Sequence, residues 1–151
     1  MLEVTQDNAG ELIVFSSPNS ISFSTEKGLE LKIAYIGRIK TIKTYNDDTE
    51  GIFKTNFMDP KTGKANGYVI ATHGQPYFAR TIFPCIDEPF WKTTFQLSIK
   101  TLSRFTVLSN TGKKSSEPIT STTYTLSKFK QTPLMATSVF GFVIGDFQMI
   151  N

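Results

Sequence analysis

The sequence of 151 residues has very little cysteine, histidine and tryptophan, with one residue of each. A single cysteine excludes an internal disulfide, and with the absence of any N-x-S/T glycosylation site it favours a reducing, cytoplasmic compartment over secretion. Cys85 and His73 are separated in sequence by a proline, and no third group is evident to orient them. We therefore interpret Cys85 as a small buried hydrophobe and not as a nucleophile.

Long apolar runs and blocks of like charge are also missing. The longest apolar run, residues 138–144, is too short to span a bilayer, and the N-terminus lacks the basic and then apolar pattern of a secretory signal. The net charge is only +3, because 16 Lys and Arg residues are scattered among 13 Asp and Glu residues. The sequence therefore predicts a chain that binds neither membranes nor nucleic acid.

What the sequence does have is aromatic residues and alternating apolar patterns. Aromatic residues make up 13% of the chain, and its length is sufficient for one domain with a core. Apolar residues do not repeat at helical spacing, whereas alternation typical of strands is frequent. The pattern predicts an all-β fold, an antiparallel β-sandwich or a saddle-shaped sheet. Predicted strands cover residues 11–16, 29–35, 51–57, 68–71, 94–100, 105–108, 123–129 and 139–147, the last as a central strand.

The connections between these strands are polar. Residues 1–10 are predicted to be frayed, and residues 11–151 to form the domain. The acidic segment 46–51 misses the spacing of a calcium-binding EF-hand loop and is interpreted as a solvated loop. Residues 59–63 have the order of residue types that is typical of a turn, and residues 113–117 are predicted to be a polar loop.

The most unusual stretch is 72–95, in which Pro84 and Pro89 enclose the acidic pair Asp87-Glu88, with Arg80 upstream. The two prolines exclude a regular helix and favour extended geometry at the residue before each. Because the acidic pair is surrounded by apolar residues, we expect an ordered, partly buried turn. Arg80 should then form a hydrogen-bonded pair with one of the two carboxylates. We interpret this pair as structural.

The string A-R-x-x-F-P-C-x-D-E-P at residues 79–89 resembles a motif of the N-terminal domain of the M1 zinc aminopeptidases, the family of puromycin-sensitive aminopeptidase and leukotriene A4 hydrolase. The segment G-I-F-K-T at 51–55 is similar to the family's G-x-Y-x-S. The segment F-K-Q-T-P-L-M-A-T-S at 129–138 is similar to its F-x-x-T-P-x-M-S-T-Y. The resemblance implies a partial N-terminal β domain that lacks the family's first strands, with an unpaired sheet edge and exposed apolar surface.

The resemblance also implies that the catalytic zinc site of the family is formed by residues outside this chain. The family holds its catalytic zinc with an H-E-x-x-H helix and a further glutamate, and neither this motif nor the G-x-M-E-N peptide-anchoring motif occurs here. No metal or other cofactor is therefore expected in this chain, and zinc is expected only in the full-length family protein. The chain should be inactive alone, and its expected partners are the catalytic domain of the same protein and peptide or protein N-termini.

Two residues of the chain match positions at which the family's N-terminal domain contacts substrate. The family's Q-x-E pair aligns with His73 and Gln75 when counted back from Ala79-Arg80. In the family the glutamate helps to hold the free α-amino group of the peptide through a charge-assisted hydrogen bond. Gln75 keeps an acceptor oxygen without the charge, and leukotriene A4 hydrolase resembles it in this respect. The sequence leaves two roles open for His73, which are contact with a ligand and a hydrogen bond within a loop.

Two other functions remain open on the sequence. A non-catalytic, peptide-binding relative of the aminopeptidases would suit the loss of the anchoring glutamate at Gln75. An independent β-sandwich binding module would need only the all-β pattern. An intact H-E-x-x-H motif downstream of residue 151 would distinguish an aminopeptidase from a non-catalytic relative.

Overall fold

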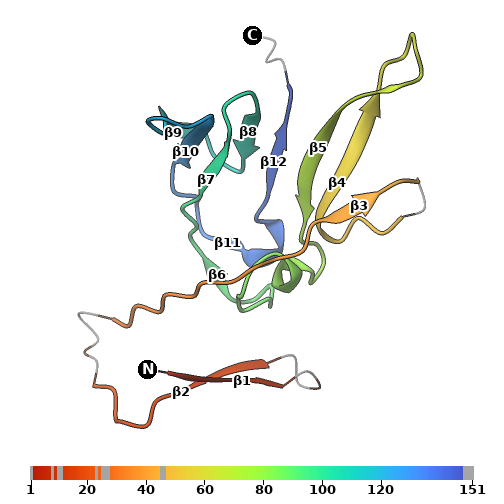
Figure 1. Cartoon of the computed structure of the whole chain (residues 1–151). Helices are drawn as coiled ribbons and strands as arrows, with labels where there is room; N and C mark the ends of the chain where they lie inside the picture. The colour runs from red at the N-terminus through yellow and green to blue at the C-terminus, as the bar shows by residue number, and fades with distance from the viewer. Residues whose placement is uncertain are drawn as a thin grey trace. The chain divides into compact units, whose positions relative to one another are not determined.

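The structure, a computed structural model, describes residues 2–7, 9, 12–22, 24, 28–44 and 47–147, and it is almost entirely β (Figure 1). It divides into two compact units, Met1–Ala34 and Tyr35–Asn151. The strands are β1 (Glu3–Asp7), β2 (Leu12–Ser16), β3 (Lys40–Ile42), β4 (Gly51–Met58), β5 (Ala65–His73), β6 (Lys92–Thr93), β7 (Ser98–Leu102), β8 (Thr106–Ser109), β9 (Lys113–Pro118), β10 (Tyr124–Phe129), β11 (Met135–Ala136) and β12 (Phe142–Gly145). Two short 3-10 helices, η1 (Ala79–Thr81) and η2 (Thr137–Val139), complete the described elements.

The first unit contains an antiparallel hairpin of β1 and β2, which pair from Glu3 opposite Ser16 to Asp7 opposite Leu12. The strand predicted near residues 11–16 is present, but residues 3–7 are a strand where the sequence suggests a frayed end. The physical reason is the apolar strand β2, whose edge offers backbone hydrogen bonds to the segment that precedes it.

The strand predicted over residues 29–35 is wrong, because these residues are extended without pairing to any strand of the described chain. Leu29 and Leu31 are exposed to 67% and 48%. Alternation of apolar and polar residues produces a strand only where a neighbour supplies the ladder and covers one face.

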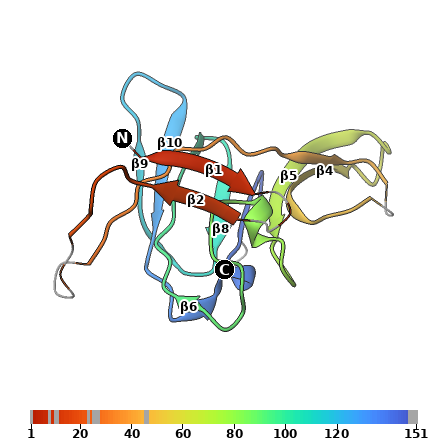
Figure 2. The ribbon, with the colours of Figure 1, turned by 90° about the horizontal axis from the view of Figure 1, so that it is seen from below.

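The second unit is built from two main sheets. A five-stranded sheet has the order β3-β4-β5-β12-β8, and a three-stranded sheet has the order β7-β10-β9. The β3–β4 pair is parallel, and the other pairs are antiparallel. Both views place the three-stranded sheet beside the β8 edge of the larger one (Figures 1 and 2). The predicted central strand is confirmed as β12, between β5 and β8.

The core of the second unit lies between these two sheets. Val107 of β8 and Ile144 of β12 pack with Phe129 of β10, and all three are buried. Ile70 of β5 and Ile99 of β7 extend this cluster. The two sheets therefore share one hydrophobic interior, as the prediction of an antiparallel all-β fold requires.

The loop predicted at residues 113–117 is wrong, since β9 occupies Lys113–Pro118 and pairs with β10. Most of its side chains are exposed. A polar strand with lysines is typical of a sheet edge, where charged side chains discourage pairing with another chain. Polarity alone could not separate such an edge strand from a loop.

Gly51 begins β4 at the point where the five-stranded sheet meets η1. Its φ is +77°, and a Cβ at this position would lie 2.3 Å from Thr81 Oγ1. The Thr81 hydroxyl is held in place because it donates to the carbonyl of Phe78 at 2.7 Å. Glycine is therefore required both by backbone conformation and by the close approach of η1.

Replacement of Gly51 by alanine should lower the free energy of unfolding by about 2–3 kcal/mol, because left-handed strain and a steric clash add together. Urea titration of the isolated chain would measure the loss. Gly63→Ala is the matched control, since Gly63 also has positive φ (+63°) but a Cβ added there would meet no atom within 4 Å. Equal losses in the two variants would mean that Thr81 moves aside without cost.

Candidate functional site

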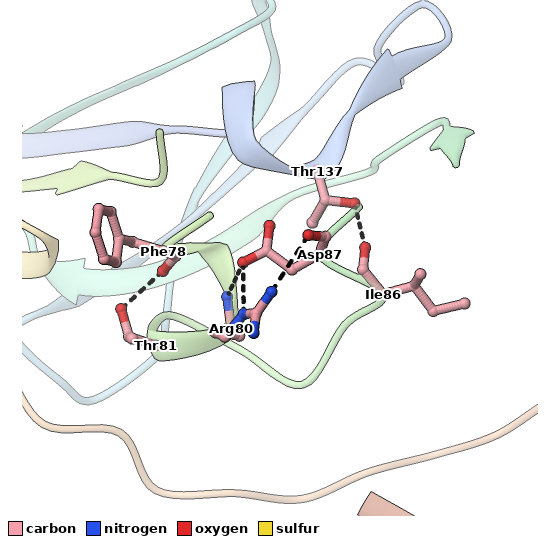
Figure 3. A network of polar contacts seen from close by, with 6 residues as sticks. All are labelled: Phe78, Arg80, Thr81, Ile86, Asp87 and Thr137. Atoms are coloured by element: carbon pink, nitrogen blue, oxygen red, sulfur yellow. Dashed lines mark hydrogen bonds and ion pairs between the residues drawn. The ribbon is translucent and has the colours of Figure 1, made fainter. Parts of the chain in front are cut away.

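Arg80 and Asp87 close the loop between η1 and β6 (Figure 3). One carboxylate oxygen of Asp87, Oδ2, accepts from the backbone N–H of Arg80 at 3.0 Å and from its Nε at 3.2 Å. Nη2 of Arg80 donates to the backbone carbonyl of Asp87 at 3.5 Å. The Asp87 side chain is only 3% exposed, so its charge is held away from water against the guanidinium. The predicted pairing of Arg80 with one of the two carboxylates is confirmed, and Asp87 is the partner.

The other residues of the motif lie around this pair. Pro84 and Cys85 are half-buried, whereas Glu88 and Pro89 are exposed. Burial, and secondarily the charge of Asp87, raise the pKa of the Cys85 thiol to about 11, against a lowering contribution from Arg80. A thiol with such a pKa is a poor nucleophile near neutral pH, which supports a packing role for Cys85. The acidic pair is therefore split, with Asp87 inside and Glu88 facing solvent.

Thr137 joins the motif loop to η2, a contact that the sequence did not indicate. Its hydroxyl donates to the carbonyl of Ile86 at 3.0 Å, and Thr137 is only 4% exposed (Figure 3). The segment of residues 129–138 was noted for its family resemblance, but its pairing with residue 86 depends on the fold. This hydrogen bond fixes η2 beside the loop closed by Arg80.

An open cleft of about 710 Å³ lies where β4 begins and β5 ends. Gly51 is opposite His73 in the β4–β5 ladder, so the residues before Gly51 and after His73 leave the sheet side by side. The cleft is lined by Asp47, Asp48, Thr49, Glu50, His73, Gln75, Pro76, Phe78, Pro89 and Ser138. The structure thus brings His73 and Gln75, the two predicted substrate-binding residues, into one depression.

Gln75 is exposed at the surface of this cleft, directly after Gly74. A Cβ on Gly74 would lie 2.7 Å from the backbone carbonyl of Ser138, so η2 and the chain before Gln75 are in close contact. The peptide bond between Gln75 and Pro76 is cis. Gln75 is therefore presented on a backbone positioned by η2.

His73 ends β5 and is exposed, with its Nδ1 3.2 Å from Thr49 Oγ1. This contact matches the loop hydrogen bond considered for His73 in the sequence. Since His73 also lines the cleft, the contact fixes one ring nitrogen and leaves the ring at the cleft wall. A role in contacting a ligand stays a prediction.

The acidic residues beside His73 were interpreted from sequence as part of a solvated loop, and the structure places them on the cleft wall. Asp47 accepts hydrogen bonds from the backbone N–H groups of Lys43 and Thr44, and these bonds lower the pKa of its carboxyl. Asp48 accepts from Lys40 Nζ at 2.7 Å and from the backbone N–H of Glu50 at 2.8 Å, with the same effect on its pKa. The pairing of residue 51 with residue 73 locates this wall, and the sequence carried no signal for it.

Glu50 differs from these two aspartates. Its pKa is raised, first by desolvation and then by the neighbouring Asp48. The contribution of Asp48 comes from a hydrogen bond between the two side chains and from the charge of Asp48. Glu50 therefore brings a negative charge to the cleft that its surroundings disfavour.

The described residues contain no group of three His, Cys, Asp or Glu side chains arranged to hold a metal ion. The same residues contain no helix that is long and apolar enough to cross a membrane.

Comparison with known proteins places these features in a family. The family described as the peptidase M1 N-terminal domain matches residues 2–139. Protein TMA108 of Saccharomyces cerevisiae is 50% identical over 150 residues, which is 99% of this chain and 16% of that protein. Human aminopeptidase Q is 32% identical over 125 residues, 81% of this chain and 12% of that protein. Puromycin-sensitive aminopeptidase of Caenorhabditis elegans is 24% identical over 150 residues, 99% of this chain and 15% of that protein. The chain thus spans less than a fifth of each relative.

Arg80→Ala should lower the free energy of unfolding by about 2–4 kcal/mol, because it leaves the Asp87 carboxylate buried without its guanidinium. Lys128→Ala is the matched control, since Lys128 forms an exposed ion pair with Glu117 at 3.2 Å. That control should cost no more than about 1 kcal/mol. Chemical denaturation would measure the free energy of unfolding of both variants. Equal small losses of stability would show that solvent stabilises the Asp87 charge when Arg80 is removed.

The Cys85 thiol should react slowly with iodoacetamide in the folded chain. With a pKa of about 11, only about one thiol in a thousand is ionised at pH 8. Unfolding in urea should then accelerate alkylation by about two hundredfold, since an unperturbed thiol has a pKa of about 8.5 and is about one-quarter ionised at pH 8. Mass spectrometry at timed intervals would give both rates. A similar rate before and after unfolding would contradict a desolvated Cys85.

Proposed function

The chain belongs to the peptidase M1 N-terminal domain family, and from this premise we propose that it forms one wall of the site in which a larger, aminopeptidase-like protein holds a peptide N-terminus. The observation that carries the proposal is the cleft where β4 begins and β5 ends. It contains both His73 and Gln75, the positions at which the family's substrate-contacting pair aligns. A concave surface that gathers a few polar groups is a common form of ligand site.

The Gln75 side chain can accept a hydrogen bond from the ammonium group of a peptide through its amide oxygen. His73 lies two residues earlier on the same wall, and its ring is oriented by Thr49. Acidic residues on the opposite side of the ladder favour a positively charged ligand group. These features support recognition of a free α-amino group.

Hydrolysis would require groups from the catalytic domain of the larger protein. The donor set of this chain does not fit zinc, because it offers one histidine and a half-buried thiol of raised pKa. No catalytic step is therefore assigned to these residues. Their contribution is to bind and orient the peptide, and a cytoplasmic location stays a prediction.

A non-catalytic, peptide-binding protein is the second candidate. The observation that favours it is the pair His73 and Gln75, which departs at both positions from the family's glutamine and glutamate. Such a protein would use the same cleft to hold peptide N-termini without cleaving them. Complete absence of aminoacyl-substrate hydrolysis by the zinc-loaded full-length protein, together with peptide binding, would favour this candidate.

Gln75→Glu in the full-length protein should tighten binding of a peptide with a free N-terminus by about 1–2 kcal/mol, because a carboxylate holds an ammonium group more firmly than an amide does. The N-acetylated peptide carries no such charge and should gain nothing. Fluorescence anisotropy with a labelled pentaalanine and its acetylated form would measure both affinities.

Gln96→Glu is the matched control, since Gln96 is exposed and outside the cleft. It adds the same charge to the protein and should change neither affinity. Equal gains for free and acetylated peptides in Gln75→Glu would mean that residue 75 does not contact the amino group.

A further inference from the structure

We propose that Glu50 supplies the negative charge that recognises the ammonium group of a bound peptide, in place of the carboxylate that is missing at residue 75. This inference rests on the proposed function, because it concerns the ligand of the same cleft. Nothing in the chain's sequence motifs assigns a role to Glu50, which precedes the G-I-F-K-T segment. Its position at the cleft follows from the fold.

The geometry places Glu50 on the same wall as the predicted peptide contacts. Gly51 and His73 are paired in the β4–β5 ladder, so Glu50 continues beyond the ladder on the side where Gly74 and Gln75 follow. Glu50 and Gln75 both line the cleft of about 710 Å³. An ammonium group in this cleft can therefore meet an amide oxygen from one strand end and a carboxylate from the other.

The other carboxylates of the cleft are already engaged. Asp47 is occupied by the backbone N–H groups of Lys43 and Thr44 and by the Thr44 hydroxyl. Asp48 is neutralised by Lys40 at 2.7 Å. These bonds shape the loop, and they leave these two carboxylates less suited to an incoming cation.

Glu50 is the remaining acidic side chain on the described wall, and its side-chain hydrogen bond is to another acid, Asp48. Its ionised form is disfavoured by partial desolvation and by Asp48, and it is favoured more weakly by Lys40 and His73. A ligand cation would relieve this imbalance, because an opposite charge stabilises the ionised carboxylate. A neutral or acetylated N-terminus would not.

The arrangement also gives His73 and its partner Thr49 a supporting role. Thr49 is the residue between Asp48 and Glu50, and its hydroxyl contacts His73 Nδ1 at 3.2 Å. This contact joins the acidic loop to the end of β5 beside Gln75. The pairing of β4 with β5 and the contact between Thr49 and His73 therefore limit the distance between the Glu50 carboxylate and the Gln75 amide.

The test uses the full-length protein, a labelled pentaalanine whose first peptide bond is N-methylated to slow hydrolysis, and the same peptide acetylated at its N-terminus. The wild type should bind the free peptide more tightly than the acetylated one. Glu50→Gln should reduce this preference by about tenfold, while affinity for the acetylated peptide stays the same. Because the readout is a ratio of two affinities, a general loss of stability would not imitate it.

Glu117→Gln is the matched control, since Glu117 is an exposed acid on β9 away from the cleft lining and its change removes the same charge. It should leave the preference intact. The double variant Glu50→Gln with Gln75→Glu should regain the preference, because it moves the carboxylate from residue 50 to residue 75, the position that it has in the family.

The outcomes separate the two proposals. A wild type without preference for the free peptide would overturn the proposed function, and the role of Glu50 with it. If the wild type prefers the free peptide and Glu50→Gln keeps this preference, the role of Glu50 alone is overturned. Loss of affinity for both peptides in Glu50→Gln would also overturn it, because Glu50 would then maintain the cleft and not select the charge.

Discussion

The buried carboxylate of Asp87 is the constraint on which the geometry of the site depends. A charge that is 3% exposed must be matched by an opposite charge and by hydrogen bonds, and Arg80 provides both through its side chain and its backbone. The resulting closed loop directs the carbonyl of Ile86 toward Thr137. This places η2 against Gly74, and so sets the backbone that carries Gln75. A structural ion pair thus helps to position a residue that lies outside the loop it closes.

The hydrophobic core between the two sheets stabilises the fold, whereas the cleft presents polar side chains. Val107, Phe129 and Ile144 hold the two sheets together by burying apolar surface. The cleft lies at the end of a ladder, where backbone pairing stops and polar side chains can face a ligand. Family membership accounts for the scaffold, whereas activity has to be argued from the groups at this site. Those groups, as far as the described residues go, are amide, imidazole and carboxylate side chains.

Residue 75 is a glutamine, and the cleft still has acidic side chains. Asp48 is compensated by Lys40, but Glu50 remains across the ladder from His73. A site can keep its preference for a cation when a charge moves from one strand end to the neighbouring one, because Coulomb attraction has little directional requirement. The hydrogen bond is more directional, and Gln75 retains an acceptor for it.

The sequence by itself determined the all-β class, the central strand near residues 139–147 and the pairing of Arg80 with an acidic neighbour, since periodicity and charge pairing are local properties. It also determined the family, because the motif at 79–89 is long and mixed in composition. Only the tertiary structure decided that Asp87 is buried and Glu88 is not, and that Glu50 lines the same cleft as Gln75. It also decided that residues 29–35 stay unpaired and that residues 113–118 form an edge strand. Each of these depends on which distant segment becomes a neighbour, and residues 50 and 75 line one cleft because β4 and β5 pair.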